Sequence, residues 1–289
     1  MRYEWISFTT DYGLTDPFVG ICHGVIGRIA PHARVIDITH GVPAGAIRHG
    51  AHTLAQSVAY LPGCVHCAVV DPGVGTARRG IALVADGGLL VGPDNGLLLP
   101  AAEALGGARE AYELTAAEYR LGEVSATFHG RDIFAPAAAH LATGVAPAAL
   151  GPAVRPGELE LLPEPHVRVR DGTLTAEVLT VDAFGNVQLA ATEADLADAG
   201  LARDPVRVDA GTGDHTGDHI ATPGRTFADV EPGRLVLLVD SAGWVALAVN
   251  RGSAAAQLGL TALPRSPSGS QERTVTLSPS ATSPGASTA

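Results

Sequence analysis

The chain has 289 residues, enough for two modest domains or one large one, and 46% of them are hydrophobic, which suffices for a folded core. It is acidic, with 30 Asp and Glu residues against 19 Lys and Arg residues and a formal net charge of -11. This balance argues against a nucleic-acid partner and tolerates a cationic ligand. All 19 basic residues are arginine, which excludes a P-loop and Schiff-base chemistry.

Cysteine usage and hydropathy indicate a cytoplasmic protein without a membrane span. Cys22, Cys64 and Cys67 are an odd number of cysteines in a long chain, so we expect packed thiols rather than a disulfide framework. The first residues lack a signal-peptide pattern, and no run reaches the roughly 18 apolar residues of a transmembrane helix.

The first half of the chain alternates strand-like and helix-like segments. The patterns predict strands at residues 5–10, 33–38 and 67–70, helices at 19–29, 46–60 and 133–143, and a hairpin formed by 80–85 and 89–91. This alternation predicts an α/β domain over residues 1–150 with a mostly parallel sheet.

The second half is predicted to be all-β. Residues 151–166 are rich in proline and lack periodicity, so they are predicted to be a linker. Period-two segments at 167–170, 174–181 and 187–190, and a hairpin of 235–239 with 244–249, predict a smaller antiparallel β-domain over residues 167–265. Residues 266–289 are rich in Ser, Thr, Pro and Ala and are predicted to be disordered.

Two acidic turns follow predicted strands, at Asp11 and at Asp71. Ligands of open parallel sheets bind outside the carboxyl ends of strands, and the neighbouring glycines let a ligand approach the backbone. Each aspartate could instead simply cap the turn that follows it. At this level the two interpretations are about equally supported.

Two further polar segments are candidates for a site. His129 lies in the Phe128–Asp132 cluster, where Arg131 is a natural partner for Asp132, although a lone loop histidine is more often structural. In the turn 182–186, Phe184 could lie against a flat ring and Asn186 could read a base edge. The alternative there is an ordinary bulged hairpin.

Metal and dinucleotide motifs are weak. Cys64 and Cys67 form a single CxxC without a second pair, and His215 and His219 lie in a glycine-containing polar loop rather than on a helix. The sequence has no HExxH, GxSxG or GxGxxG pattern, so we expect no metal and no cofactor.

Taken in order, eight segments resemble the S-adenosylmethionine hydroxide adenosyltransferase family, which is related to the fluorinase and chlorinase enzymes. They run from about Thr9 to Gly259 and read TTDYG, DITHGVP, VVDPGVGTARRG, GPDNGLL, FHGRDIFAPAAAHLATG, VDAFGNV, TFADV and DSAGWVALAVNRGSAA. The resemblance implies an N-terminal α/β domain, a C-terminal β-barrel-like domain, and a homotrimer whose ligand lies between subunits. It also implies hydrolysis of S-adenosyl-L-methionine to adenosine and methionine.

The resemblance also implies the roles of individual residues. Asp71, Arg78 and His129 would form the reacting centre. For its chemistry, we expect Asp71 to orient His129, His129 to take a proton from water, and Arg78 to keep Asp71 ionised and to hold a developing hydroxide; alternatively Asp71 itself is the base. Asp11 would hold the ribose hydroxyls. The adenine and methionine parts would be bound by residues of the second domain, namely Asp182, Phe184, Asn186, Ser241, Asn250, Ser253 and Ala254.

Two features favour water over halide as the nucleophile. Halogenases of this superfamily carry Tyr in place of Asp71, and the fluorinase has a long insertion where this chain has only the turn at residues 86–88. One departure from the family pattern is Gly45-Ala46, where a larger residue and then Asp are usual. The alternatives are a non-catalytic binder of S-adenosylmethionine or adenosine, a halogenase, and a metal hydrolase using the loop near His215.

Overall fold

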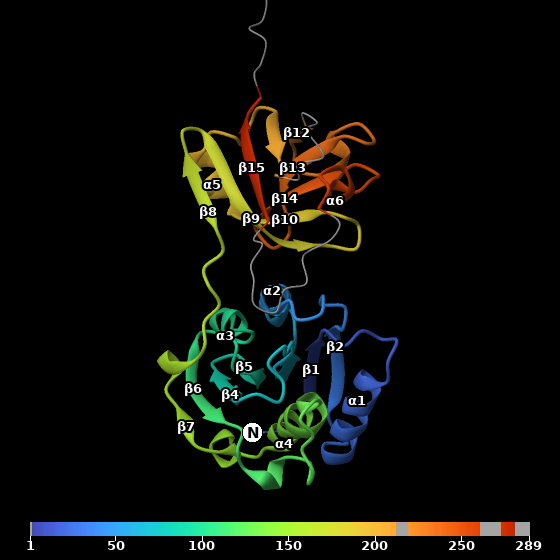
Figure 1. Cartoon of the computed structure of the whole chain (residues 1–289), viewed down its shortest axis with the longest axis vertical. Helices are drawn as coiled ribbons and strands as arrows, with labels where there is room; N and C mark the ends of the chain where they lie inside the picture. The colour runs from blue at the N-terminus through green and yellow to red at the C-terminus, as the bar shows by residue number, and fades with distance from the viewer. Residues whose placement is uncertain (1, 212–218, 261–272, 281–289) are drawn as a thin grey trace, which may run out of the picture. The chain divides into compact units, whose positions relative to one another are not determined.

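The structure, a computed structural model, describes residues 2–211, 219–260 and 273–280. The chain divides into two compact units between residues 163 and 164, within the stretch predicted to be a linker (Figure 1). Each unit has its own sheet and its own hydrophobic core. The predicted combination of an α/β domain with a smaller β-domain is confirmed.

The first unit contains a seven-stranded sheet in the order β2-β1-β3-β5-β4-β6-β7. Its strands are β1 (Trp5–Thr10), β2 (Arg34–Thr39), β3 (Val65–Val69), β4 (Gly80–Ala85), β5 (Gly88–Pro93), β6 (Ala108–Glu113) and β7 (Ala153–Val154). The pairs β1–β2, β1–β3 and β3–β5 are parallel, whereas β4–β5, β4–β6 and β6–β7 are antiparallel. The sheet is therefore mixed, because the predicted β4–β5 hairpin reverses its direction.

Helices cover both faces of this sheet. They are α1 (Phe18–Ile29), α2 (Ile47–Val58), α3 (Leu99–Ala104) and α4 (Ala135–Thr143). Successive side chains of a strand point to opposite faces, so Cys67 packs in the core with α1 and α4, whereas Ala68 packs in the core with α2 and α3. The strand ends near Asp11 and Asp71 are thus held between two packed helical layers.

Short helical turns complete the first unit. They are the 3-10 turns η1 (Ala117–Tyr119), η3 (Pro147–Leu150) and η4 (Pro156–Glu158) and the π-helical turn η2 (Gly130–Phe134). The predicted linker at 151–166 is wrong for its first part, because β7 pairs with β6 and Leu159 is buried in the core of this unit.

The second unit is a closed barrel. Its strands are β9 (Thr173–Val181), β10 (Val187–Thr192), β11 (Val206–Asp209), β12 (His219–Pro223), β13 (Leu235–Val239), β14 (Trp244–Val249) and β15 (Thr274–Pro279), with β8 (Val167–Arg170) added outside on β9. Pairing of β10 with both β14 and β9 closes the barrel. The short helices α5 (Glu193–Asp198) and α6 (Ala254–Gln257) and the turn η5 (Phe227–Asp229) lie between strands. The pair β12–β13 is parallel and the others are antiparallel.

The prediction of a disordered tail at 266–289 is wrong for residues 274–279. These residues form β15, whose Val275 and Leu277 enter the barrel core between β9 and β11. The other residues of that tail up to 272 and beyond 280 lie outside the described residues, as does His215. The three cysteines are buried free thiols, as predicted. Among the described helices, none has the length and hydropathy needed to cross a bilayer.

Candidate active site

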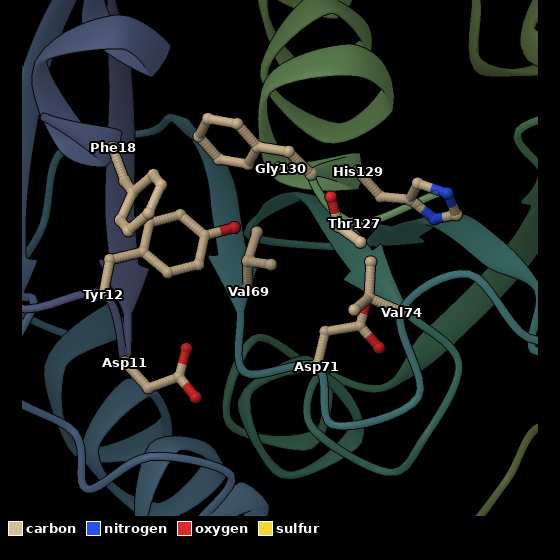
Figure 2. A pocket seen from close by; sticks show the side chains of 10 residues that line it. Asp11, Tyr12, Phe18, Val69, Asp71, Val74, Thr127, His129 and Gly130 are labelled. Atoms are coloured by element: carbon tan, nitrogen blue, oxygen red, sulfur yellow. The ribbon is translucent and has the colours of Figure 1, made fainter. Parts of the chain in front are cut away.

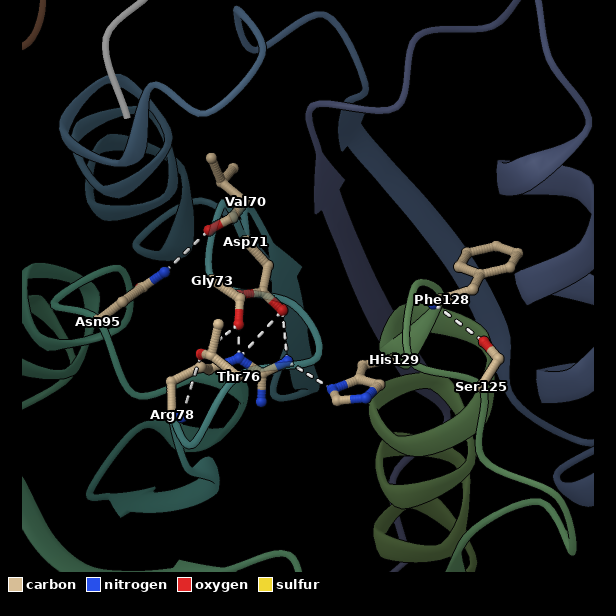
Figure 3. Close-up of polar contacts among 9 residues, drawn as sticks. All are labelled: Val70, Asp71, Gly73, Thr76, Arg78, Asn95, Ser125, Phe128 and His129. Atoms are coloured by element: carbon tan, nitrogen blue, oxygen red, sulfur yellow. Dashed lines mark hydrogen bonds and ion pairs between the residues drawn. The ribbon is translucent and has the colours of Figure 1, made fainter. Parts of the chain in front are cut away.

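The turn after β3 places Asp71 at the carboxyl edge of the sheet. The side-chain amide of Asn95 donates to the Val70 carbonyl at 3.0 Å and anchors the start of the turn (Figure 3). Gly75 has a φ of +77°, and a Cβ there would lie 2.3 Å from the Ala126 carbonyl oxygen. The glycine therefore lets this turn approach the segment that leads to His129.

Arg78 joins Asp71 to His129. Its Nε lies 2.9 and 3.0 Å from the two carboxylate oxygens of Asp71, and its Nη2 also donates to that carboxylate. The same Nη2 donates to Nδ1 of His129 at 2.8 Å (Figure 3). In the described part of the chain no hydrogen bond links Asp71 directly to His129, so Arg78, rather than Asp71, orients the ring.

This contact fixes the protonation of His129. An arginine N–H can only donate, so Nδ1 must be an acceptor, and the neutral ring carries its proton on Nε2. Burial lowers the pKa of His129 below its usual value, and the nearby Arg78 lowers it further. The imidazole is thus neutral around pH 7 and presents an N–H donor at Nε2.

The π-helical turn η2 is held by Asp132, just after His129. The buried Asp132 carboxylate accepts the backbone N–H of Ser125 at 2.8 Å and Nε of Arg131 at 2.6 Å. The Ser125 hydroxyl in turn accepts the Phe128 N–H at 3.1 Å. Arg131 is therefore the partner of Asp132 that the sequence predicts, and the pair fixes the backbone that carries His129.

Asp11 follows β1 and faces the same opening. Its Oδ2 accepts the backbone N–H of Gly45 at 2.8 Å. Burial raises the pKa of Asp11, the Gly45 N–H opposes this shift, and the negative charge of Asp71 adds to it. Gly45 has a φ of +74°, a conformation that favours glycine. The unusual Gly45-Ala46 pair thus contributes a backbone donor to Asp11.

A cavity of about 140 Å³ lies between these groups (Figure 2). Its lining residues are Asp11, Tyr12, Phe18, Val69, Asp71, Val74, Thr127, Phe128, His129 and Gly130. Tyr12, Phe18 and Phe128 form an aromatic trio with ring centroids 5.2 to 5.9 Å apart in edge-on pairs. This trio could not be predicted from the sequence, because Phe128 lies more than 100 residues from Tyr12 and Phe18.

In the second unit, Asp182 shapes the turn between β9 and β10. Its Oδ1 accepts the N–H groups of Phe184 and Asn186, both at 2.9 Å, and its Oδ2 accepts the Asn186 side-chain amide at 2.7 Å. The Phe184 ring is 80% exposed. A Cβ on Gly185 would lie 2.0 Å from the Ser253 hydroxyl, so this glycine lets the turn pack against the start of α6.

The other predicted binding residues of this unit lie in two places. Asn250 follows β14 and donates its side-chain amide to the Val230 carbonyl at 2.6 Å. Ser253 caps α6, and Ala254 is buried beside it. Ser241 lies in the turn between β13 and β14, at the other end of that hairpin from Asn250. The structure therefore groups Asp182, Phe184 and Asn186 with the segment 250–254, whereas the Ser241 turn is linked to β10 through the Gln188 side-chain amide, which donates to Asp240.

A pocket of about 600 Å³ opens beside the Asp182 turn. Phe184, Phe227, Asn186 and Arg251 line it, together with Asp182, Val249 and Gly252. Phe227 and Arg251 were not predicted, although both belong to family-like segments of the sequence. An aromatic pair, an amide and a guanidinium can hold a flat ring and a carboxylate.

The described residues contain one group with the spacing of metal ligands, formed by His23, Asp37 and His40. None of these residues lines the cavity at Asp71. The arrangement at Asp71, Arg78 and His129 instead provides a carboxylate, a fixed cation and an imidazole N–H around a small partly buried space. Such groups can hold a water molecule and accept its proton.

Comparisons with known proteins agree over both units. Residues 6–151 match the family model of the SAM hydroxide adenosyltransferase N-terminal domain, and residues 176–265 match that of the C-terminal domain. The chain is 60% identical to "(R)-S-adenosyl-L-methionine hydrolase" of Salinispora arenicola over 89% of this chain and 94% of that protein. It is 29% identical to "Fluorinase" of an Actinoplanes species over 85% of this chain and 90% of that protein.

A solved structure of an uncharacterized conserved protein from Thermotoga maritima matches 94% of this chain and 99% of that chain. The TM-score is 0.83 and the sequence identity is 34%. Together with the two matched domain models, these likenesses show that the chain belongs to the SAM hydroxide adenosyltransferase family.

Proposed function

We propose that this protein is an enzyme that hydrolyses S-adenosyl-L-methionine to adenosine and L-methionine. The observation that carries the proposal is the Asp71–Arg78–His129 arrangement beside a cavity at the carboxyl edge of the sheet. The 60% identity to a protein named as an S-adenosyl-L-methionine hydrolase supports the same substrate and reaction.

The reaction is an in-line displacement at C5′ of the ribose. A water oxygen forms the new bond to C5′, the C5′–S bond breaks, and its electron pair stays on the sulfur of methionine. The leaving group is already good because the sulfonium becomes a neutral thioether. The protein must therefore position water and remove one proton from it.

We assign the proton acceptor to Asp71 rather than to His129. The Nδ1 lone pair of His129 already accepts from Arg78, and Nε2 carries the ring proton. The imidazole is thus suited to donate Nε2–H to the attacking oxygen. A carboxylate has further lone pairs even when paired with a guanidinium, so Asp71 can take the proton while Arg78 holds it in place.

Substrate positioning uses both pockets. Asp11 accepts the ribose hydroxyls. In the second unit, Phe184 and Asn186 bind the adenine beside the segment of Asn250, Ser253 and Ala254, in which the Ser253 hydroxyl lies against Gly185. Arg251 pairs with the methionine carboxylate. Asp182 acts by shaping the turn, and Ser241 contributes from the turn between β13 and β14.

We further propose a cytoplasmic homotrimer in which each ligand lies between two subunits, and catalysis without a metal or other cofactor. The 80% exposed Phe184 ring, which lines a pocket, supports a covering subunit. Light scattering tests the assembly: a trimer has three times the chain mass of 29.4 kDa, and a monomer would contradict it.

A halogenase is the second candidate, because fluorinases are among the relatives. The Asp71 carboxylate disfavours it. Arg78, the cation that a halide could use, is already bound to Asp71 and His129. Fluoride or chloride added to the assay should therefore yield no halogenated nucleoside.

The decisive assay incubates the purified protein with S-adenosyl-L-methionine and follows adenosine and methionine by chromatography. Asp71→Asn and His129→Ala should each lower turnover by ~10²-fold or more, because each removes a group that acts on the water. Asp86→Asn is the matched control, since Asp86 also binds an arginine but is exposed in the β4–β5 turn.

Wild-type turnover in both active-site variants would refute the assignment. Tight binding of substrate without any product would favour the non-catalytic binder. Loss of product formation with a chelator would favour a metal hydrolase that uses the segment near His215.

A further inference from the structure

We propose that His23, Asp37 and His40 form a binding site for a divalent transition-metal ion, preferably Zn²⁺, away from the reacting groups. His23 comes from α1, Asp37 from the edge strand β2, and His40 directly follows that strand. One potential ligand atom from each residue lies within 4.8 Å of the other two.

The two histidines converge on one carboxylate oxygen. Nε2 of His23 lies 2.9 Å from Oδ1 of Asp37, and Nε2 of His40 lies 3.0 Å from the same oxygen. Ligand atoms of one tetrahedral Zn²⁺ ion are about 3.3 Å apart, given metal–ligand bonds of about 2.0–2.2 Å. The two histidine–carboxylate distances are slightly shorter than this, and the remaining ligand distance is within 4.8 Å, so small side-chain shifts would suffice to seat an ion.

His40 supplies an independent indication. Its side chain is only 3% exposed, yet its Nε2 makes no hydrogen bond. The atom is near Oδ1 of Asp37 but is not aligned with it for hydrogen bonding. A buried ring nitrogen without a partner costs free energy, and a metal ion on its lone pair would remove that cost.

The opposite nitrogen of the His40 ring has the partner that a metal-binding histidine needs. Nδ1 lies 2.8 Å from the Thr10 hydroxyl oxygen, within the buried end of β1. Metal-bound histidines usually donate their second ring N–H to an oxygen, which fixes the ring and leaves Nε2 free for the ion. Thr10 can accept that N–H.

The donor set selects the ion. Two imidazoles and one carboxylate suit Zn²⁺ and similar divalent transition metals, whereas Mg²⁺ and Ca²⁺ prefer oxygen ligands. His23 and Asp37 have side chains 35% and 40% exposed, so an ion can enter and water can fill the fourth position.

A bound ion would link α1 to the end of β2. The His40 carbonyl accepts the N–H of Gly13 at 2.8 Å, so the same residue also holds the turn that carries Asp11. The role of this site is therefore structural: it fixes a turn of the catalytic edge without touching the reacting groups.

The test is a Zn²⁺ titration of the full-length protein after chelator treatment, with bound metal measured by mass spectrometry of the desalted protein. The wild type should bind one Zn²⁺ ion per chain. His23→Ala and Asp37→Asn should each abolish this binding or weaken it at least ~10-fold. His32→Ala is the control, because His32 lies outside the cluster and should leave binding unchanged.

Two other measurements separate this site from adventitious binding. Zn²⁺ should raise the melting temperature of the wild type but not of the two variants. Co²⁺ in place of Zn²⁺ should give the intense visible absorption of a tetrahedral site. Wild-type protein without a bound ion at micromolar Zn²⁺, or variants that bind as the wild type does, would overturn the proposal.

This result is distinguishable from failure of the proposed hydrolysis. Chelator treatment should lower the melting temperature while adenosine formation continues. Both variants keep Asp71, Arg78 and His129, and circular dichroism checks that they fold.

Discussion

Arg78 determines how its two neighbours can act. It donates to both oxygens of Asp71 and to Nδ1 of His129, so one guanidinium fixes a carboxylate and a ring tautomer together. The side chains of Arg78 and Asp71 are 11% and 6% exposed, so water screens this pair only weakly. The arrangement has a measurable consequence for the titration of His129.

We expect His129 to titrate below its ordinary pKa of about 6.5. Burial and the positive charge of Arg78 both disfavour the imidazolium form. Protonation would also break the contact of Nδ1 with Arg78, so kcat/KM should fall as the pH drops through this lowered pKa. Proton NMR measures the midpoint of the His129 ring titration, and a pH–rate profile measures the midpoint of the fall in kcat/KM.

Arg78→Met should move the NMR midpoint of His129 toward higher pH, because a neighbouring cation is lost. Arg79→Met is the matched control, since Arg79 binds Asp94 and not His129. A wild-type midpoint above 6.5, or no shift in Arg78→Met, would contradict this account of the site.

At this scale the sequence predicted the catalytic candidates and the pairing of Arg78 with Asp71, but not the contact of Arg78 with His129. The acidic turn of Asp71 and the polar cluster of His129 stand out in the sequence, and the family resemblance adds Arg78. The bridging position of Arg78 was not foreseen, because it depends on the approach of two turns at Gly75 and Ala126.

Among the elements, the π-helical turn η2 matters most for the site. Gly130, its first residue, packs directly on the Tyr12 hydroxyl, and a Cβ at that position would lie 2.0 Å from the hydroxyl oxygen. Tyr12 cannot move freely, because its ring packs against Phe18 and Phe128. Single π-helical turns are frequent at functional sites.

Gly130→Ala should therefore displace Tyr12 or the turn that carries His129. We expect a loss of about 1–3 kcal/mol in stability from overpacking and a fall in kcat/KM measured with S-adenosyl-L-methionine. Adding Tyr12→Phe to this variant removes the hydroxyl oxygen that the new Cβ would meet, and it should restore part of the lost stability and part of the lost kcat/KM. Independent, additive effects of the two changes would argue against the contact.

Strand β3 carries a buried histidine, His66, whose titration has a predictable effect on stability. His66 is buried, its Nδ1 lies 2.8 Å from the Ser7 hydroxyl oxygen, and burial lowers the pKa of His66 to about 4. Because the folded-state pKa is depressed, the stabilising contribution is full above about pH 6.5 and is lost as the pH falls toward 4.

When the pH is lowered from 7 to 5, the titration of His66 should reduce the free energy of unfolding by about 2 kcal/mol. Denaturant titrations of the wild type and of His66→Gln at both pH values measure it, since glutamine does not titrate. Equal losses of stability in the two proteins would show that His66 is not responsible.

Elements that are marked by their own residues were predicted correctly, whereas elements that depend on pairing with distant strands were missed. Strand β1 and helix α1 were predicted from apolar periodicity within their own residues. Strand β15 was missed because only Val275 and Leu277 mark it, and its hydrogen bonds come from β9 and β11. Strand β7, with two residues, likewise exists only through its pairing with β6.

At the scale of the whole molecule, each unit presents its own set of binding groups. The first presents carboxylates at Asp11 and Asp71, and the second presents aromatic rings and Arg251. The net charge of -11 also favours the approach of a cationic substrate. The family resemblance named most of the polar residues of both pockets, whereas the aromatic trio of the first pocket and Phe227 and Arg251 of the second were not predicted.

The most direct test of the central claim is hydrolysis of S-adenosyl-L-methionine in water enriched with ¹⁸O, followed by mass spectrometry of both products. Attack of water on C5′ predicts adenosine that carries one ¹⁸O atom in its 5′-hydroxyl and methionine without label. Absence of adenosine, or adenosine without the label, would contradict the account.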